Sequence, residues 1–264
     1  MEEAKIALAP FLCSCPAVVT LGIRASFDDY SSAEKDLLRH AHRVFFPTPR
    51  FLDIFQALDI PTFPRPTTYR YQRSRVLQQL LFQYAGVPHP RSHIYYGKRQ
   101  KRRILEELDP PFLLMGPESL PGSTYIVDTP QLPEAFLERH NPIIACEAIE
   151  WSQRIRLICV QFECVGALRQ VSARPKASPY DANTFEALPL EILSSPRSGL
   201  HELHIMTLRF LELAQLDDIL IEWGYGAGTW QMIGMSRPPM HWSTPGGAEN
   251  RHHHICRFIQ AGLL

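Results

Sequence analysis

The sequence predicts an α/β layer followed by a larger α+β region, and two patterns carry this prediction. Up to about residue 68, short apolar strands alternate with amphipathic helices, which is typical of an open α/β layer. From Pro111 onward, short strands separated by turn residues follow one another as antiparallel neighbours do. Of the 264 residues, 45% are hydrophobic and 20% are charged, so the chain has enough apolar side chains for packed cores. Its length suits one large domain or two to three subdomains.

The first layer is predicted element by element. Residues 17–21 are apolar and end at a glycine, which indicates a buried strand. Ser31 and Glu34 form a capping-box pattern at the start of a helix. Residues 43–46 form a second strand, and a threonine followed by a proline begins a helix over residues 48–58.

One longer helix is predicted over residues 69–85. Leu77, Leu80, Leu81 and Tyr84 recur on one helical face. Gly86 follows at the natural helix end.

For the second region, the sequence predicts mainly strands and few helices. The loop expected over residues 172–198 is rich in proline and serine and has little periodicity. The other expected elements are strands at 112–115 and 125–127, a helix at 132–138, a strand at 143–146, a hairpin of 155–160 with 163–168, a helix at 200–213, strands at 219–223 and 229–233, and a last helix at 251–264.

Several local sequences in this order resemble the ATP-grasp superfamily, in particular the RimK-like carboxylate-amine ligases. They are YAGVPHP at 84–90, FLLM at 112–115, IACEAIEWSQRIRLICV at 144–160, ALR at 167–169 and the hairpin at 219–238. The resemblance covers about residues 15–240. It implies an ATP-grasp fold with an N-terminal α/β (pre-ATP-grasp) layer at 1–68, a linker helix and small lid subdomain at 69–145, and a C-terminal subdomain at 146–264.

The resemblance also implies a chemistry. In these ligases ATP phosphorylates a carboxylate, and an amine attacks the acyl phosphate. Lysines neutralise the phosphates, a hinge strand binds adenine through its backbone, and carboxylates with an asparagine hold Mg²⁺.

The nucleotide positions match this pattern in part. Arg75 stands at the family's first lysine, and Met115 stands at the second, where a thioether carries no charge. Glu147 and Ile149 match the hinge glutamate and the adenine-contacting backbone. Arg154 replaces the acidic residue that usually precedes the next strand.

The catalytic and metal positions also match in part. Arg156 and Arg169 match two arginines that clamp the acyl phosphate or the substrate carboxylate. Glu222 matches the first metal-binding acid, but the family's E-x-N pair reads Gly-Met-Ser at 234–236. The resemblance therefore implies ATP as a ligand with Mg²⁺ bound weakly or not at all. For Glu147, Arg156 and Glu222 the alternative is an ordinary solvated or ion-paired side chain.

These matches predict a degenerate ATP-grasp protein that binds a nucleotide or other ligand, with a small-molecule or peptide carboxylate as partner. An active ATP-dependent ligase remains an alternative. The shortage of lysine, at five of 27 basic residues, fits the loss of phosphate-binding lysines. Neither the amine nor the oligomeric state is predicted.

A basic-patch protein is the other alternative. Aromatic and basic residues alternate at 69–75, and KRQKRR follows at 98–103, a pattern that binds RNA by stacking and phosphate neutralisation. Glu106, Glu107 and Asp109 come directly afterwards, and 27 basic residues balance 27 acidic ones. We therefore expect no nucleic acid partner.

Two further expectations concern metals and location. His252 and Cys256 share a helical face, but they lack a nearby second pair of zinc ligands, so free side chains are expected. The apolar residues 6–21 contain Pro10 and Pro16 and follow two glutamates, unlike a signal peptide or a membrane span. With six scattered cysteines, this predicts a cytoplasmic protein.

Overall fold

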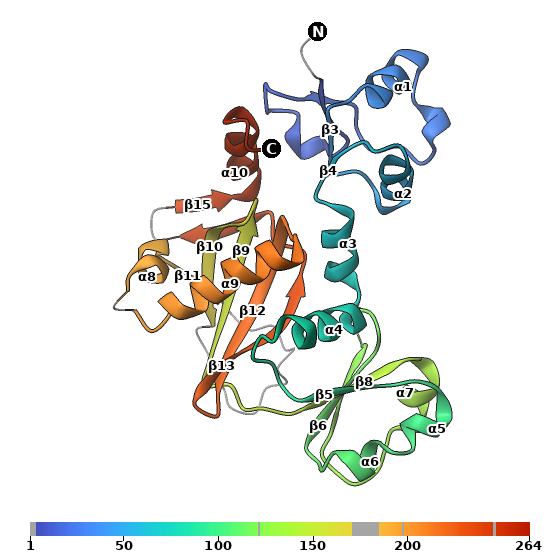
Figure 1. The fold of residues 1–264 in the computed structure, drawn as a ribbon, viewed down its shortest axis with the longest axis vertical. Coiled ribbons are helices and arrows are strands. Elements are labelled where there is room, and N and C mark those ends of the chain that lie inside the picture. The colour runs from blue at the N-terminus through green and yellow to red at the C-terminus, as the bar shows by residue number, and fades with distance from the viewer. Residues whose placement is uncertain (1–3, 121, 171–184, 197, 245–246) are drawn as a thin grey trace.

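Three larger sheets, each with its own helices, and one separate two-stranded sheet near the C-terminus make up the computed structural model of the protein (Figure 1). The structure describes residues 4–120, 122–170, 185–196, 198–244 and 247–264. The N-terminal sheet and the lid sheet lie at opposite ends, and the large sheet lies beside the helices that join them (Figure 1). The expected combination of an α/β layer with α+β subdomains is confirmed.

The N-terminal layer is a four-stranded parallel sheet in the order β2–β1–β3–β4. Ser31 caps its first helix in the expected capping box with Glu34. Strands β1 and β4 were not predicted. The elements are β1 (Lys5–Ala7), η1 (Pro10–Leu12), β2 (Val19–Thr20), η2 (Phe27–Asp29), α1 (Ser32–Arg39), β3 (Arg43–Phe45), α2 (Pro49–Ala57) and β4 (Thr62–Phe63).

The predicted long helix is wrong in one respect, because it is two helices, α3 (Pro66–Arg73) and α4 (Arg75–Ala85). Ser74 is extended between them, and its hydroxyl accepts a hydrogen bond from the backbone N–H of Leu77. The N–H of Arg75 donates to the carbonyl of Pro117 at 2.9 Å instead of continuing a helix. Contacts with a distant loop therefore break a helix that local periodicity favours.

The lid is an antiparallel sheet in the order β5–β8–β6–β7. Helices pack on one of its faces, over a core that includes Phe112, Leu114 and Ile143. The opposite face carries Met115, Ile144 and Cys146. The elements are β5 (Ser92–Tyr95), α5 (Gly97–Lys101), α6 (Ile104–Glu107), β6 (Phe112–Met115), β7 (Thr124–Val127), α7 (Glu134–Arg139) and β8 (Ile143–Glu147).

The large sheet has five antiparallel strands in the order β11–β10–β9–β12–β13. The expected loop at 172–198 contains a strand, which pairs with β10, and a helix, which packs beside α9. Residues 171–184 lie outside the described residues. The elements are β9 (Gln153–Val160), β10 (Glu163–Gln170), β11 (Phe185–Leu188), α8 (Leu190–Ser194), α9 (His201–Ala214), β12 (Asp218–Gly226), β13 (Thr229–Ser236), β14 (His241–Thr244), β15 (Gly247–Asn250) and α10 (Arg251–Gln260).

Side-chain alternation gives the large sheet two different faces. Ile155 and Leu157 of β9, with Ile221 of β12, pack toward α9 in one core. Their neighbours Arg156 and Glu222 point the other way, since successive strand residues face opposite sides. We call this second side the charged face.

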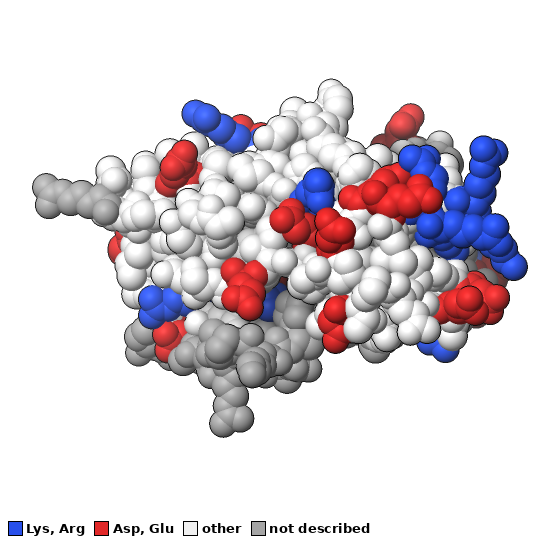
Figure 2. Space-filling model, turned by 90° about the horizontal axis from the view of Figure 1, so that it is seen from below, with Lys and Arg blue, Asp and Glu red and all other residues white. Residues whose placement is uncertain are grey.

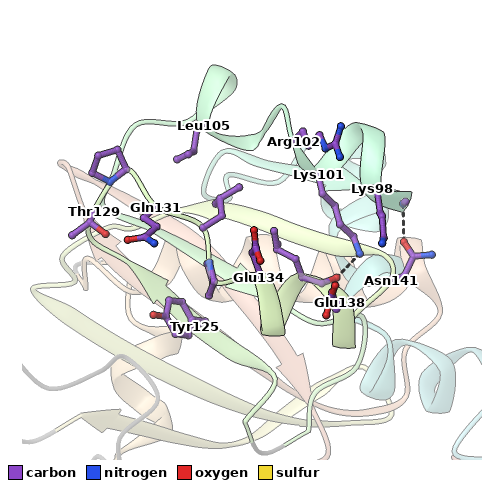
Figure 3. Close-up of a pocket in the computed structure, with 15 residues that line it drawn as sticks. Lys98, Lys101, Arg102, Leu105, Tyr125, Thr129, Gln131, Glu134, Glu138 and Asn141 are labelled. Carbon is purple, nitrogen blue, oxygen red and sulfur yellow. Dashed lines mark hydrogen bonds between the residues drawn. The ribbon is translucent and has the colours of Figure 1, made fainter.

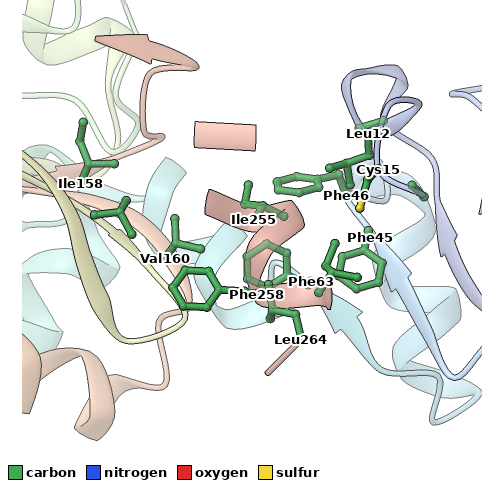
Figure 4. Close-up of a cluster of buried hydrophobic side chains, with 14 of the residues drawn as sticks. Leu12, Cys15, Phe45, Phe46, Phe63, Ile158, Val160, Ile255, Phe258 and Leu264 are labelled. Atoms are coloured by element: carbon green, nitrogen blue, oxygen red, sulfur yellow. The ribbon is translucent and has the colours of Figure 1, made fainter. Parts of the chain in front are cut away.

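The C-terminal helix α10 fills the space between the N-terminal layer and the large sheet (Figure 4). Ile255 and Phe258 of α10 share one buried cluster with Phe45 and Phe63 from the N-terminal sheet and with Val160 from β9. The division at residues 68/69 and 145/146 stays a prediction.

In the part of the chain that the structure describes, no helix combines the length and the apolar character needed to cross a membrane.

Candidate functional site

Three charged side chains meet at the centre of the charged face. Strand pairing places Glu222 of β12 opposite Arg156 of β9, and Gly224 opposite Arg154. Arg156 Nε donates to Glu222 Oε2 at 3.0 Å, and Arg154 Nη2 donates to Glu222 Oε1. We call this group the arginine–glutamate triad. Both oxygens of the carboxylate are therefore bound by cations.

The triad is largely shielded from water. The side chains of Arg154 and Glu222 are 6% and 13% exposed, and that of Arg156 is 34% exposed. Two arginines and one glutamate leave a net charge of +1 in a place where solvent screens little.

The residues at this site do not fit Mg²⁺. The two arginines that donate to Glu222 place positive charge where a Mg²⁺ ion would approach the carboxylate, and they repel it. The next strand has Gly234 and Ser236 where the family's second acid and asparagine would stand. Over the described residues, no three His, Cys, Asp or Glu side chains converge on a possible metal position.

A cavity of about 730 Å³ adjoins the triad. Arg156 forms part of its wall, and its guanidinium lies 3.9 Å from the ring centroid of Phe185. Arg237, directly after β13, adds a second cation. Trp242 closes the side toward the N-terminal layer and packs so closely on Gly166 that an added Cβ would lie 2.8 Å from its ring. The cavity is thus a partly apolar space with two arginines in its wall.

Trp151 covers the charged face on the other side of the triad. It belongs to the segment between β8 and β9, and its ring lies over Gly224, where an added Cβ would be 2.4 Å away. Ile149 lies over Gly226 in the same way, at 2.7 Å from an added Cβ. The two glycines let this segment lie flat against β12.

Met115 lies in an apolar cluster. It is 6% exposed and packs with Ile144, Cys146 and Val76. Burial raises the pKa of Cys146 to about 12, so this thiol stays neutral. The lid face around Met115 is therefore formed by apolar side chains.

Arg75 binds the loop between β6 and β7. Its guanidinium donates to the carbonyl of Ser123 at 2.8 Å and to the hydroxyl at 3.0 Å. Ser123 Oγ also donates to the carbonyl of Glu118 at 2.9 Å. The loop between β6 and β7 is thus tied to the start of α4, and Arg75 is the cation at its base.

The remaining predicted residues lie in different places. Glu147 is the exposed last residue of β8, and its N–H donates to the carbonyl of Arg91. Arg169 is opposite Ile155 in the sheet, so its side chain points away from the charged face, and it pairs with Glu186 at 3.1 Å. The structure therefore brings Arg156 and Glu222 together but places Arg169 on the opposite side of the sheet.

Sequence reasoning missed Gln78, Trp151 and Arg237. Gln78 of α4 bonds to both backbone groups of Met235 on the outer edge of β13. A signal for Trp151 was present, because glycines alternate at 224 and 226 on one strand face and leave room for a large ring. Nothing in local sequence points to Gln78 or Arg237.

The basic segment 98–103 lies on the lid and has internal partners. Lys101 Nζ donates to the carbonyls of Leu137 and His140 at the end of α7, and Arg103 pairs with Glu107 at 2.8 Å. Acidic side chains lie beside basic ones on the surface seen from the lid end (Figure 2). The prediction against a nucleic acid partner stays a prediction.

A second, larger cavity lies beside the same segment. It measures about 1180 Å³ and has Lys98 and Arg102 on one wall with Glu134 and Glu138 on another (Figure 3). None of the predicted site residues lines it.

His252 and Cys256 lie one turn apart on α10, as expected. His252 hydrogen bonds to Ser14 at 3.3 Å, and Cys256 lies beside Cys15. Both side chains face the N-terminal layer.

Comparisons with solved structures identify the fold. A structure of the ATP-grasp ligase PsnB complexed with minimal precursor, Mg and ADP superposes with a TM-score of 0.65 at 14% identity, covering 99% of this chain and 98% of that one. The RimK domain ATP-grasp protein from Sphaerobacter thermophilus DSM 20745 gives 0.64 at 14% identity, covering 89% and 90%.

The ADP complex of PurK, an N5-carboxyaminoimidazole ribonucleotide synthetase, gives 0.59 at 13% identity. It covers 89% of this chain, and the chain spans 63% of the PurK structure. No protein-family model and no curated protein matches the sequence. The structural matches confirm the expected ATP-grasp fold.

Proposed function

We propose that this chain, which has the ATP-grasp fold, binds a nucleotide between lid and large sheet and holds its phosphates with arginines rather than through magnesium. The arginine–glutamate triad carries the proposal. Each oxygen of Glu222 accepts from an arginine, and these two cations offset the negative charge that the carboxylate would offer to a metal ion. The triad's excess positive charge suits a phosphate or carboxylate.

The lid residues also support nucleotide binding without the ligase reaction. Arg75 stands at the base of the loop between β6 and β7, and Met115 is buried among apolar side chains. Loss of charge-stabilising groups near the transferred phosphoryl group slows transfer more than it weakens binding, since each is commonly worth a few kcal/mol in the transition state, roughly 3–4 for one donor. A RimK-like protein that has kept the ligand cleft and lost the ligase reaction fits these residues.

The structural neighbours that hold ADP support the nucleotide part of the proposal. The PurK structure holds ADP, and the PsnB structure holds its precursor with Mg and ADP. For this chain we infer a carboxylate partner of small-molecule or peptide type in the cavity lined by Arg156 and Arg237. A cytoplasmic location goes with the proposal, because all six cysteines are free thiols.

Thermal shift of the full chain with ATP tests the proposal. With millimolar ATP and EDTA the unfolding temperature rises, because a ligand that binds only the native state stabilises it. Arg156→Gln removes most of this rise. Arg169→Gln is the matched control, since its side chain points to the other side of the same sheet, and it leaves the rise intact.

Two results contradict the proposal. One is an unchanged unfolding temperature at every ATP concentration. The other is a rise that appears only with Mg²⁺ and is accompanied by release of ADP when carboxylates and amines are added, which is the behaviour of the active ligase.

A further inference from the structure

Two cysteines oppose each other on the β9–β10 hairpin. Cys159 and Cys164 are directly paired residues, and their Sγ atoms lie 3.6 Å apart. The register shifts between Cys164 and Gly166, which leaves Val165 as an extra residue beside the pair. Both sulfurs therefore lie on the face toward α9, in contact with each other.

A histidine from α9 completes the group. His204 of α9 lies close to Cys164, and its interaction with this thiol raises the pKa of the imidazole. Cys159 is buried, whereas Cys164 and His204 are half-buried. Asp218 is the other charged group that acts on Cys159.

We propose that Cys159 and Cys164 form a peroxide-oxidisable dithiol site, in which Cys164 attacks the peroxide and Cys159 closes a disulfide. The site does not depend on the proposed nucleotide binding. Its two sulfurs face each other on neighbouring strands, with an imidazole close to one of them.

The reaction balances with hydrogen peroxide as the oxidant. The Cys164 thiolate attacks one peroxide oxygen, the O–O bond breaks, and the departing hydroxide takes a proton from the His204 imidazolium to leave as water. Cys164 is then a sulfenic acid. The Cys159 sulfur attacks it, the S–O bond breaks, and a second water leaves with the thiol proton. Two thiols and one peroxide thus yield one disulfide and two waters.

Geometry and charge favour both steps. A disulfide needs sulfurs about 2.05 Å apart, so the pair closes by a movement of about 1.5 Å between side chains that already touch. The hydrogen bond from the Cys159 thiol, with the His204 imidazole, lowers the pKa of Cys164, although burial opposes this. The thiolate is the nucleophilic form.

The chain contains its own comparison pair. Cys15 and Cys256 also face each other, but burial and Cys15 raise the pKa of Cys256 to about 12, so it stays protonated. Cys13 is exposed and serves as an ordinary surface thiol. Accessibility alone would make Cys13 react first.

Peptide mapping of the reduced full-length protein tests the site. One equivalent of hydrogen peroxide is added at pH 7, free thiols are blocked with iodoacetamide, and disulfides are then reduced and labelled with N-ethylmaleimide. We expect the second label on Cys159 and Cys164 before any other cysteine. Without peroxide, iodoacetamide should modify Cys164 roughly tenfold faster than Cys13.

Variants separate the roles. Cys159→Ser should leave the Cys164 sulfenic acid to be trapped by dimedone, and His204→Gln should slow Cys164 alkylation roughly tenfold. Cys13→Ser is the matched control and should change neither rate. The mapping of the unmodified chain needs no variant, so a folding defect in Cys159→Ser leaves the test intact. The inference is overturned if Cys164 reacts no faster than Cys13, or if peroxide links other cysteines first.

Discussion

Glu222 accepts hydrogen bonds from Arg154 and Arg156. Removing the charge of Glu222 should therefore lower the free energy of unfolding. Glu222→Gln removes the counter-charge of two arginines, one of which is 6% exposed. Removing one partner of a buried ion pair is strongly destabilising, so we expect a loss on the order of 3 kcal/mol in the free energy of unfolding by urea.

Glu186→Gln is the matched control. It breaks the pair with Arg169 on the same sheet, where both side chains are 50% exposed, and exposed pairs contribute less than about 1 kcal/mol. Equal losses in the two variants would show that the triad is not a buried ionic group.

Asp217 gives a prediction of pH dependence. Its carboxylate accepts from the N–H of Arg65 and the hydroxyl of Thr68, yet burial raises its pKa to about 6. Because the unfolded pKa is lower, the native state binds more protons between about pH 4 and 6. The Asp217 contribution to stability is therefore present at low pH and is lost as pH rises toward 6.

Asp217→Asn should remove this dependence. The difference in unfolding free energy between variant and unmodified chain should change by up to about 3 kcal/mol between pH 4 and 7, as a shift of two pKa units implies. Urea titrations at both pH values measure it. A difference that does not vary with pH would refute the assignment.

Between elements, Gln78 joins α4 to the free edge of β13. Its amide donates to the carbonyl of Met235 at 2.8 Å and accepts from its N–H at 3.2 Å. Gln78→Leu leaves two buried backbone groups unpaired, each at about 1–3 kcal/mol. We expect a loss on the order of 3 kcal/mol in urea unfolding.

Gln83→Leu lies on the exposed side of the same helix and should change stability by less than about 0.5 kcal/mol. If both variants behave alike, the link between α4 and β13 does not hold the elements together.

Elements whose signals are local could be predicted from sequence, and those set by distant contacts could not. The capping box at Ser31 and the glycine after α4 mark helix ends within a few residues. The break at Ser74 depends on the loop around Pro117, and β1 exists because β2 and β3 lie on either side of it.

In the candidate site too, local patterns could be predicted from sequence and contacts between distant residues could not. Alternation in β9 and β12 correctly sets Arg156 and Glu222 apart from their apolar neighbours. It could not reveal that Arg154 would share Glu222, because strand register is a property of the folded sheet. Nor could it reveal that the bulge between Cys164 and Gly166 shifts the register of β10 against β9 and so places Arg169 opposite Ile155.

At the scale of the whole molecule, α10 connects the two ends of the chain. Lys5 Nζ donates to the carbonyls of Ile259 and Leu264 at 3.1 Å and 2.6 Å. Phe258 is 3% exposed in the core shared with the N-terminal sheet and β9 (Figure 4).

Phe258→Ala should destabilise the protein by roughly 3–5 kcal/mol and speed hydrogen exchange in β1 and β3, which lie far from it in sequence. Tyr84→Ala, at a side chain that is 83% exposed, is the control and should leave exchange unchanged. Faster exchange confined to α10 would argue against a shared core.

The binding of ATP with and without magnesium tests the central claim most directly. Isothermal titration of the full chain is carried out in EDTA and again in millimolar Mg²⁺. If arginines hold the phosphates in place of a metal, ATP binds in both, with dissociation constants within about threefold, a difference under 1 kcal/mol. Binding that requires Mg²⁺, or no binding in either condition, would contradict the account.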